Sequence, residues 1–248
     1  NSASIYSRTW PMTEAFYGKP PRDLGLVNIS PIEMMFWLYC PIKLPRSNEC
    51  TVPDNLLGFM PLVEAVRRDL PPEVWRANYI YLTAKTLWVT HENPGNRRGW
   101  HSDGFMTDDL NYVWSDRAGT LFWTPLDLIT FTQDHSLSLA EMDEAAELGP
   151  HKTYPDKHLL KLDQSVIHRV ADFAAAGVRS FAKISVSRHR YNLAGNSINH
   201  ALAADWELIE RKPERNHPIG HSHTSADALK GELYPCKPDI FAATYDAA

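Results

Sequence analysis

The stretch "NYIYLTAKTLWVT", residues 78–90, marks the point at which the character of the chain changes. It is rich in β-branched and aromatic residues, which favour extended backbone in a pleated sheet. Short strands separated by turn-prone residues are typical of a small barrel or of a two-sheet jelly roll. Downstream segments with the same texture are "LNYVWSD" (110–116), "TLFWTPLDLITF" (120–131), "HLLKLD" (158–163), "SVIHRV" (165–170) and "RSFAKISVS" (179–187).

Helical patterns precede and interrupt these strands. "FMPLVEAVRRDL" (59–70) spaces its aliphatic residues along one helical face and is followed by two prolines, which predicts a helix. A second helix is predicted with Ser138 as its N-cap, Glu141 completing a capping box and Gly149 at its end. "SPIEMMFWLY" (30–39) also begins like a capped helix, but its aromatic end is equally consistent with a strand.

Composition narrows the classes of protein to consider. The formal net charge of −5 argues against a nucleic-acid partner, and no apolar run approaches the roughly 18 residues that a membrane span requires. The three cysteines have no CxxC spacing, so we expect inert thiols and a cytoplasmic location. Nucleophile-elbow, phosphate-loop and dinucleotide signatures are missing from the sequence. With no linker or repeat, we expect a single domain over residues 1–248.

The segment "WHSDGF" (100–105) suggests a metal site. In a strand, residues two apart point to the same face, so His101 and Asp103 can present an imidazole nitrogen and a carboxylate oxygen to one point. His168, in the strand-like "SVIHRV", is the candidate third ligand. Two histidines and one carboxylate form the facial triad that binds non-haem Fe(II) and leaves coordination positions open.

The triplet alone is weak, because a chain with 11 histidines and 30 acidic residues contains roughly one His-x-acid triplet by chance. Read alone, His101 and Asp103 would be interpreted as a polar turn. The order of residues is more specific. A distal histidine on a late strand is followed by Arg179, and a buried arginine there can bind a carboxylate through two hydrogen bonds.

This layout resembles the Fe(II)/2-oxoglutarate-dependent dioxygenase superfamily over residues 78–195. The resemblance implies a fold that is mainly β with α, with a double-stranded β-helix (jelly-roll, cupin-like) core and flanking helices. Residues 1–77 would then form a helical and extended buttress, and residues 196–248 a C-terminal extension.

Carried across residue by residue, the resemblance implies that His101, Asp103 and His168 ligate Fe(II). Arg179 would bind the distal carboxylate of the co-substrate 2-oxoglutarate. Many members show Arg-x-Ser where this chain reads Arg179-Ser180-Phe181, so Lys183, on the same strand face, is an alternative anchor. The strand over 78–90 would run beside the site, where Tyr79, Tyr81 and Lys85 on one face, or Thr86 on the other, can contact 2-oxoglutarate.

The activity that the resemblance implies is hydroxylation of a small molecule with O2, releasing succinate and CO2. The carboxylate at Asp103 favours this over halogenation, because halogenating relatives replace it with a small residue. Phe105 and Tyr112, just beyond the ligands, are the expected substrate contacts, although core packing is the alternative for most of the neighbouring aromatic residues. Desaturation and cyclisation stay open, as do the substrate and the oligomeric state.

Two other classes of function remain. A cupin-like hydrolase or isomerase would use the same ligands without 2-oxoglutarate, and a non-catalytic barrel would use His101 and Asp103 only for hydrogen bonding. We favour the oxygenase because Arg179 has no role in either alternative. "HPIGHSH" (217–223) carries three more histidines, but without strands around them we expect a solvent-facing segment.

Overall fold

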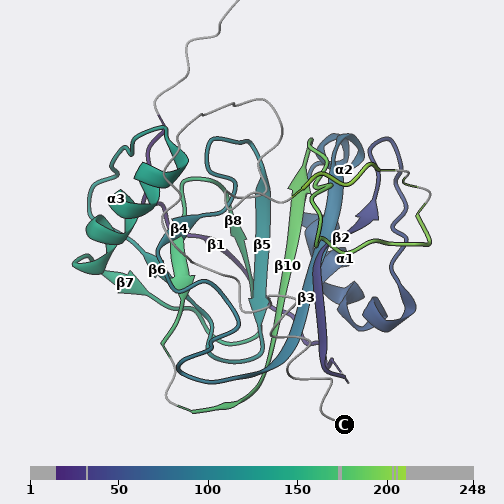
Figure 1. Cartoon of the computed structure of the whole chain (residues 1–248), viewed down its shortest axis with the longest axis horizontal. Helices are drawn as coiled ribbons and strands as arrows, with labels where there is room; N and C mark the ends of the chain where they lie inside the picture. Colours follow the sequence, from purple (N-terminus) through teal and green to yellow (C-terminus); the bar gives the residue numbers. More distant parts are fainter. Residues whose placement is uncertain (1–14, 32, 173–174, 203, 205, 211–248) are drawn as a thin grey trace, which may run out of the picture.

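The protein, described by a computed structural model, is built mainly from two antiparallel β-sheets that face each other (Figure 1). The structure describes residues 15–31, 33–172, 175–202, 204 and 206–210. Over these residues the expectation of a mainly β fold with few helices is confirmed. No described helix has the length and apolar character needed to cross a bilayer.

Six described strands form the larger sheet in the order β1-β8-β5-β10-β3-β2. Their bounds are Arg22–Leu26 (β1), Met35–Lys43 (β2), Tyr79–Val89 (β3), Leu110–Ser115 (β5), His158–Leu162 (β8) and Gly177–Ser187 (β10). The smaller sheet has four described strands in the order β4-β9-β6-β7. Their bounds are His101–Ser102 (β4), Thr120–Trp123 (β6), His151–Lys152 (β7) and Ile167–Val170 (β9).

The N-terminal region, which we expected to form a helical and extended buttress, adds two strands to the larger sheet. "SPIEMMFWLY" contributes to β2, so the strand interpretation of this segment is confirmed and the helical one is wrong. Met35, Phe36 and Trp37 pair with β3, and this pairing outweighs the local capping signal. "TLFWTPLDLITF" forms a strand only over its first four residues, because Pro125 cannot donate a ladder hydrogen bond.

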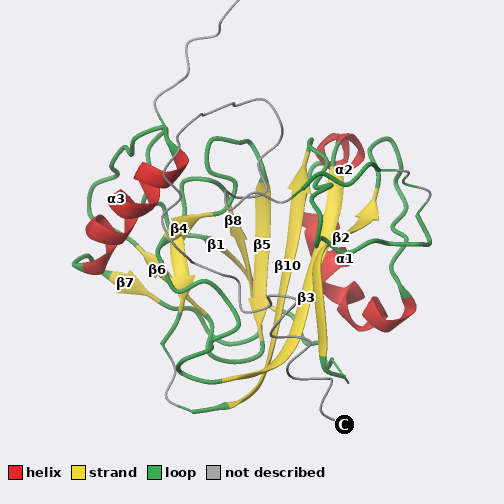
Figure 2. Ribbon diagram, in the orientation of Figure 1, coloured by secondary structure: helices red, strands yellow, loops and turns green. Residues whose placement is uncertain are grey.

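Helices flank both sheets (Figure 2). The predicted helix over 59–70 is confirmed as α1, which packs against the larger sheet together with a short 3-10 helix. The helix predicted at Ser138 begins earlier, because Asp134 caps it by accepting hydrogen bonds from two backbone N–H groups. The bounds are Asp54–Phe59 for the 3-10 helix, Met60–Asp69 (α1), Pro72–Ala77 (α2) and His135–Glu147 (α3).

Alternation along the strands of the larger sheet separates a core from a cavity. On β10, Ala182 and Ile184 point towards α1 and join the largest hydrophobic cluster. Phe181 and Lys183 point the other way and line a cavity on the side of the smaller sheet. The two faces of one strand therefore serve the core and the site respectively.

Candidate metal centre

The two predicted histidine ligands face each other across the smaller sheet. His101 on β4 pairs directly with His168 on β9, and their ring centroids are 4.5 Å apart. His101 Nδ1 lies 2.8 Å from the carbonyl oxygen of Gly99, and His168 Nδ1 lies 3.2 Å from that of Val166. With Nδ1–H donating to a carbonyl, each ring leaves Nε2 available to bind a metal ion. This is the usual way of orienting a metal-binding imidazole.

Asp103 reaches the same point from the turn that follows β4. Gly104 occupies the left-handed region at φ +73°, and a Cβ built there would lie 3.1 Å from Asp109 Cβ. The Thr107 hydroxyl and backbone N–H both donate to the Gly104 carbonyl oxygen, at 2.7 and 2.9 Å. This tight turn holds Asp103 Oδ2 at 3.5 Å from His168 Nε2.

The structure brings the three predicted metal ligands together. His101, Asp103 and His168 each offer one ligand atom, and these atoms lie within 4.8 Å of one another. The donors are two imidazole nitrogens and one carboxylate oxygen, a set suited to a divalent transition metal. The cluster can therefore hold a metal ion.

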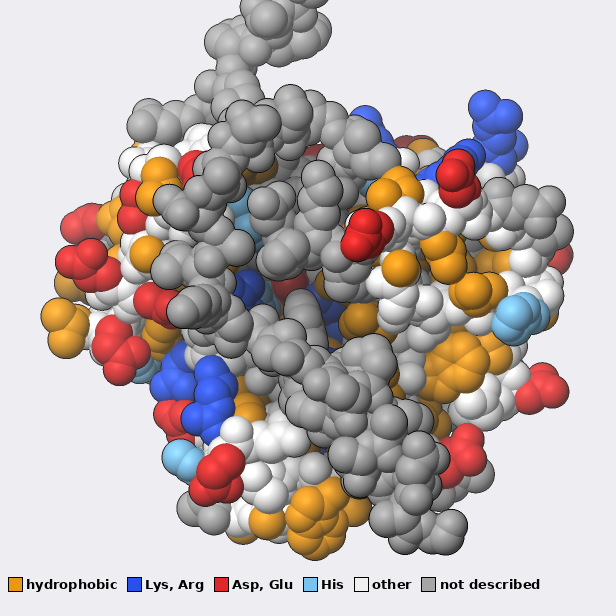
Figure 3. All heavy atoms as spheres, in the orientation of Figure 1, with side chains coloured by type: hydrophobic (Ala, Val, Ile, Leu, Met, Phe, Trp, Pro, Cys, Tyr) orange, Lys and Arg blue, Asp and Glu red, His pale blue; other side chains and the backbone are white. Residues whose placement is uncertain are grey.

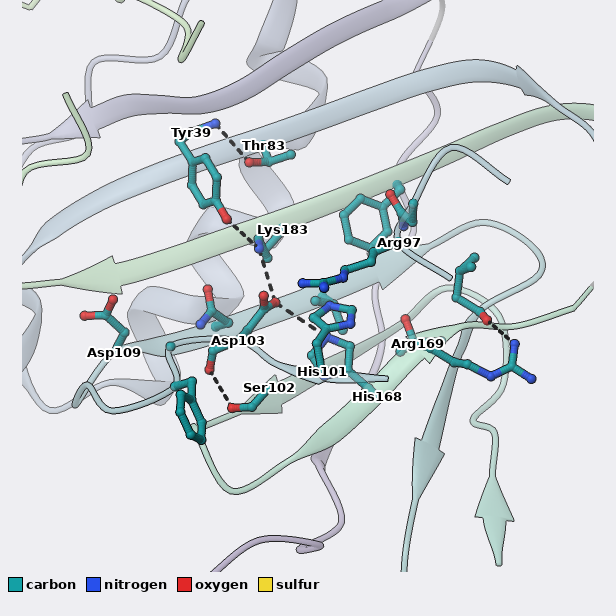
Figure 4. A pocket seen from close by; sticks show the side chains of 18 of the residues that line it. Tyr39, Thr83, Arg97, His101, Ser102, Asp103, Asp109, His168, Arg169 and Lys183 are labelled. Carbon is teal, nitrogen blue, oxygen red and sulfur yellow. Dashed lines mark hydrogen bonds and ion pairs between the residues drawn. The ribbon is translucent and has the colours of Figure 1, made fainter. Parts of the chain in front are cut away.

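Lys183 on β10 joins the larger sheet to this cluster. Its Nζ lies 3.2 Å from Asp103 Oδ2 and 3.0 Å from the Tyr39 hydroxyl oxygen (Figure 4). Burial by itself would raise the pKa of the Asp103 carboxyl, but the Lys183 ammonium and then His168 outweigh it and hold that pKa well below its usual range. Asp103 is therefore ionised at neutral pH, as a metal ligand must be.

Tyr39 reaches the site through an irregularity in β2. Pairing of β2 with β3 shifts register between Trp37 and Cys40, and Tyr39 has a positive φ of 47°. Its backbone N–H donates to the Thr83 hydroxyl at 3.0 Å, so a side chain on β3 replaces the regular ladder hydrogen bond. Such bulges redirect side chains, and here the Tyr39 ring lines the cavity.

The cluster lies on a cavity of about 120 Å³ between the two sheets. Basic and acidic side chains are visible in a hollow at the centre of the face shown in Figure 3. A cavity of this size can hold a small organic molecule but not a folded partner. The charged residues that line it are Lys85, Arg97, Asp103, Asp109, Arg169 and Lys183.

Arg179 lies on the predicted strand but does not line this cavity. Its Nε donates to the carbonyl oxygens of Arg117 and Ala118, both at 3.1 Å, and its guanidinium packs over Phe181, whose ring does line the cavity. Arg179 therefore has a structural role that we did not expect, and its presence no longer separates the oxygenase from the alternatives. Burial lowers the pKa of the Arg179 guanidinium to about 10, and its Nη2 has no hydrogen-bond partner among the described residues.

The other sequence-predicted residues divide between cavity and core. Lys183, Lys85 and Phe105 line the cavity, although Phe105 is fully buried. Tyr112 lies on the opposite face of β5, where its hydroxyl donates to Asp69 Oδ2 at 2.7 Å, so the structure gives no support to a substrate contact. Tyr81 does not line the cavity either; its hydroxyl donates to the His189 carbonyl oxygen.

Sequence reasoning missed several of the cavity residues, among them Tyr39, Arg97 and Asp109. Tyr39 lies in an apolar run whose bulge leaves no sequence signal. Arg97 lies in the loop before β4, next to the predicted ligands, and that proximity was the one available clue. Asp109 follows Asp108 directly in the chain, and nothing in the sequence distinguishes the two acids.

The histidines of "HPIGHSH" lie outside the described residues. No protein-family model matches the chain, and no curated protein matches it in sequence.

Proposed function

We propose that the protein is an Fe(II)- and 2-oxoglutarate-dependent dioxygenase that hydroxylates a small molecule with release of succinate and CO2. The observation that carries this proposal is the meeting of His101, Asp103 and His168 on a cavity between two sheets. Two histidines and one carboxylate occupy one face of a metal ion and leave the remaining positions to a co-substrate and O2.

The connection of the strands supports a double-stranded β-helix. From β3 to β6 the chain alternates between the larger and the smaller sheet, and from β7 to β10 it alternates again. The core of the larger sheet is β8-β5-β10-β3, and it faces β4-β9-β6-β7. This is the connectivity that we expect of a jelly roll formed by two intertwined strand pairs.

The basic side chains of the cavity support an anionic co-substrate. Lys85 on β3 lies opposite Phe181 in register, and Lys183 is two residues further along β10. Both ammonium groups line the cavity, so we assign to them the carboxylates of 2-oxoglutarate. Arg179 is the alternative for the distal carboxylate, because its Nη2 has no partner among the described side chains and backbone groups.

Each residue then has a defined task. His101 and His168 bind the metal through Nε2 while backbone carbonyls fix their rings, and Asp103 adds a negative charge. Lys183 keeps Asp103 ionised and positions its carboxylate. Bound Fe(II) would supply the redox chemistry by which O2 is activated as 2-oxoglutarate is decarboxylated. The enclosing sheets orient the substrate and limit access of water.

A metal-dependent hydrolase or isomerase is the second candidate. It is favoured by the structural role of Arg179. The hydrogen bonds of Arg179 to the carbonyl oxygens of Arg117 and Ala118 satisfy part of the hydrogen-bonding capacity of its guanidinium without any co-substrate. Such an enzyme would use the same three ligands and would be active without O2. A non-catalytic binding module would use the same residues only as a polar network.

The test is an anaerobic titration of metal-free protein with Fe(II) and then with 2-oxoglutarate, monitored for a visible charge-transfer band. We expect one iron per chain in the wild type and none in His168→Ala, whereas His91→Ala, which changes an exposed histidine, should match the wild type. Lys85→Met should weaken 2-oxoglutarate binding at least tenfold, because a charge-assisted hydrogen bond contributes about 1.5–3 kcal/mol. Lys19→Met is the control for loss of an exposed lysine.

The outcomes separate the candidates. A band that appears in the wild type, disappears in His168→Ala and needs more 2-oxoglutarate in Lys85→Met supports the proposal. If Arg179→Ala weakens 2-oxoglutarate binding and Lys85→Met does not, the anchor is Arg179. Iron binding without a band would leave the hydrolase or isomerase, and no metal binding would leave the binding module.

A further inference from the structure

Asp109 is a buried acid in the wall of the cavity. It is 3% exposed, and it lies in the segment between the Gly104 turn and β5. The Tyr191 hydroxyl donates a very short hydrogen bond to its Oδ2. Among the described residues, no group makes a hydrogen bond of normal geometry to its Oδ1. A buried carboxylate oxygen without a well-placed donor is costly, and in a cavity wall it indicates a ligand that supplies the donor.

Among the described residues, no cation is in contact with Asp109. Ser187 and Tyr191 face its carboxyl through their hydroxyls, His189 and Asp108 act from a longer range, and burial raises its pKa in spite of the hydroxyls. No ion pair among the described residues involves Asp109. Its neighbour Asp108 pairs with Arg188 at 3.3 Å. The buried acid therefore lacks the positive partner that buried charges normally have.

The cavity is divided by charge on either side of the metal ligands. In Figure 4, Asp109 lies on one side of Asp103 and His101, while Arg97 lies on the other. Lys85, which pairs in register with Phe181, belongs to the Arg97 side through its hydrogen bond to Asn96 Oδ1 at 3.2 Å. The basic half suits the dianionic co-substrate, and the half with Asp109 is left for the second reactant.

We propose that Asp109 binds a protonated amine of the prime substrate, so that the substrate is a small aliphatic ammonium compound whose carbon chain extends towards the metal ligands. This inference rests on the proposed function, because it assigns the basic half of the cavity to 2-oxoglutarate. An ammonium group donates three hydrogen bonds. Its positive charge would also supply the partner that the Asp109 carboxylate does not have among the described residues.

The surroundings of Asp109 suit such a group. Thr107 and Asn111 line the same cavity on the two sides of Asp109 in the chain. Thr107 Oγ1 accepts a hydrogen bond from the Asp109 backbone N–H at 3.2 Å, and Asn111 Oδ1 accepts one from the Ser185 hydroxyl at 2.6 Å. The lone pairs left on these oxygens can accept further hydrogen bonds from an ammonium group.

The experiment compares three probes that differ in their head group, namely n-butylammonium, 1-butanol and butyrate. Binding is measured by ligand-detected NMR to the protein alone and to the protein with Zn(II) and 2-oxoglutarate, since Zn(II) is redox-inert and diamagnetic. We expect n-butylammonium to bind the wild type saturably in the millimolar range, as suits a fragment of this size. Asp109→Asn, which keeps the shape and removes the charge, should weaken this binding at least tenfold.

Asp108→Asn is the matched control, because it removes the same charge from the adjacent, exposed residue. It should bind n-butylammonium like the wild type. If Asp109→Asn unfolds, intermolecular NOEs from bound n-butylammonium to the ring protons of Tyr39 and Tyr191 locate the probe in the wild type instead. Such NOEs support the proposal, and saturable binding without them overturns it.

Three other outcomes also overturn the inference. They are tighter binding of butyrate or 1-butanol than of n-butylammonium, equal amine binding by wild type and Asp109→Asn, and no saturable amine binding. The result is distinct from the test of the proposed function. Amine binding at Asp109 without a charge-transfer band with Fe(II) and 2-oxoglutarate would keep the amine site and reject the oxygenase.

Discussion

Asp103 is held from three directions, and each contact serves its use as a ligand. The turn at Gly104 sets its backbone, Lys183 contacts Oδ2 from the larger sheet, and His168 contacts the same oxygen from β9. Because both neighbours favour the anion, this carboxylate loses its proton before any metal arrives. The site is therefore organised in advance for a cation, at the cost of holding several charged groups close together.

Gly104→Ala should weaken both metal binding and the fold. Its φ of +73° disfavours an L side chain, and the new Cβ would lie 3.0 Å from Thr107 Oγ1 and 3.1 Å from Asp109 Cβ. The turn must shift, and Asp103 shifts with it. We expect a loss of about 1–3 kcal/mol in the free energy of unfolding and at least a tenfold loss of Zn(II) affinity. Urea unfolding and metal titration measure the two effects.

Gly25→Ala is the control for this prediction. Gly25 also has a positive φ, of +88°, but nothing lies within 4 Å of the position of its Cβ. It should lose only the stability that backbone strain costs, about 1 kcal/mol, and keep the metal affinity of the wild type. Equal metal affinities in the two variants would show that the Gly104 turn does not position Asp103.

Sequence reasoning found the three candidate metal ligands at this scale because they have a chemical pattern that depends only on residue type and strand spacing. It missed Tyr39, because a bulge in β2 is set by pairing with Thr83 and not by local residues. It placed Tyr112 in the site, whereas this residue belongs to the hydrophobic cluster that includes α1. Which face of β5 points towards the cavity depends on which face of the larger sheet packs against α1. Parity along a strand is predictable, but its absolute direction is a tertiary property.

Among the elements, α3 supports the site from outside the smaller sheet. Asp143 Oδ1 accepts a hydrogen bond from the Trp100 backbone N–H at 2.6 Å, directly before His101. The Trp100 ring packs against Met142 and Ala146 of the same helix in one hydrophobic cluster. The helix therefore holds Trp100, the residue directly before β4, in place.

Removing this contact should weaken metal binding through His101. We expect Asp143→Ala to lower the free energy of unfolding by about 1–2 kcal/mol, because a hydrogen bond to a charged acceptor is lost. Metal affinity should fall several-fold. Glu144→Ala, an exposed change on the same helix, should alter neither quantity. Calorimetric Zn(II) titration of both variants checks this, and a wild-type affinity in Asp143→Ala would refute the role of α3.

Element β2 ends in a fully buried lysine, which gives a prediction for pH. Burial lowers the pKa of the Lys43 ammonium to about 8, although the Cys50 thiol opposes the shift. The unfolded chain therefore binds more protons than the native protein between pH 8 and about 10.4, so Lys43 contributes stability that rises with pH over this window. Its Nζ donates to the carbonyl oxygens of Asn78, at 2.8 Å, and Leu44.

Lys43→Met should remove this rise. The free energy of unfolding of the variant minus that of the wild type should be about 1–2 kcal/mol lower at pH 9.5 than at pH 7.5. The prediction concerns this change with pH and not the absolute difference between the two proteins. Urea unfolding of both proteins at the two pH values gives the difference directly, and groups common to both proteins cancel. A difference that does not change with pH would mean that Lys43 keeps its ordinary pKa in the native protein.

Capping signals were the weakest predictors of element bounds. The Ser138 capping box predicted the right helix but the wrong first turn, because Asp134 supplies the cap and Glu141 instead accepts hydrogen bonds from Thr132. Strand texture was more reliable, since β-branched and aromatic residues are selected by burial along the whole element. β3 and β10 were therefore predicted to within a few residues.

At the scale of the whole molecule, the candidate metal centre lies where the two sheets meet. The metal ligands come from the smaller sheet and its following turn, whereas Lys183 and Tyr39 come from the larger one. A third hydrophobic cluster between the sheets contains Phe122 of β6 and Phe181 of β10. A metal bound by His101, Asp103 and His168 would link β4 and its turn to β9 within the smaller sheet. That sheet is joined to the larger one by this cluster and by the Lys183–Asp103 ion pair.

Metal binding should thus raise the stability of the entire molecule. A ligand that binds only the native state at 100 times its dissociation constant adds about 2.7 kcal/mol, which for a chain of this size is roughly 5–10 °C in the unfolding temperature. We expect Zn(II), or Fe(II) without oxygen, to produce such a rise, and a chelator to reverse it. His168→Ala should unfold at one temperature with or without metal, while His91→Ala should respond like the wild type. An equal rise in His168→Ala would place the bound metal elsewhere in the protein.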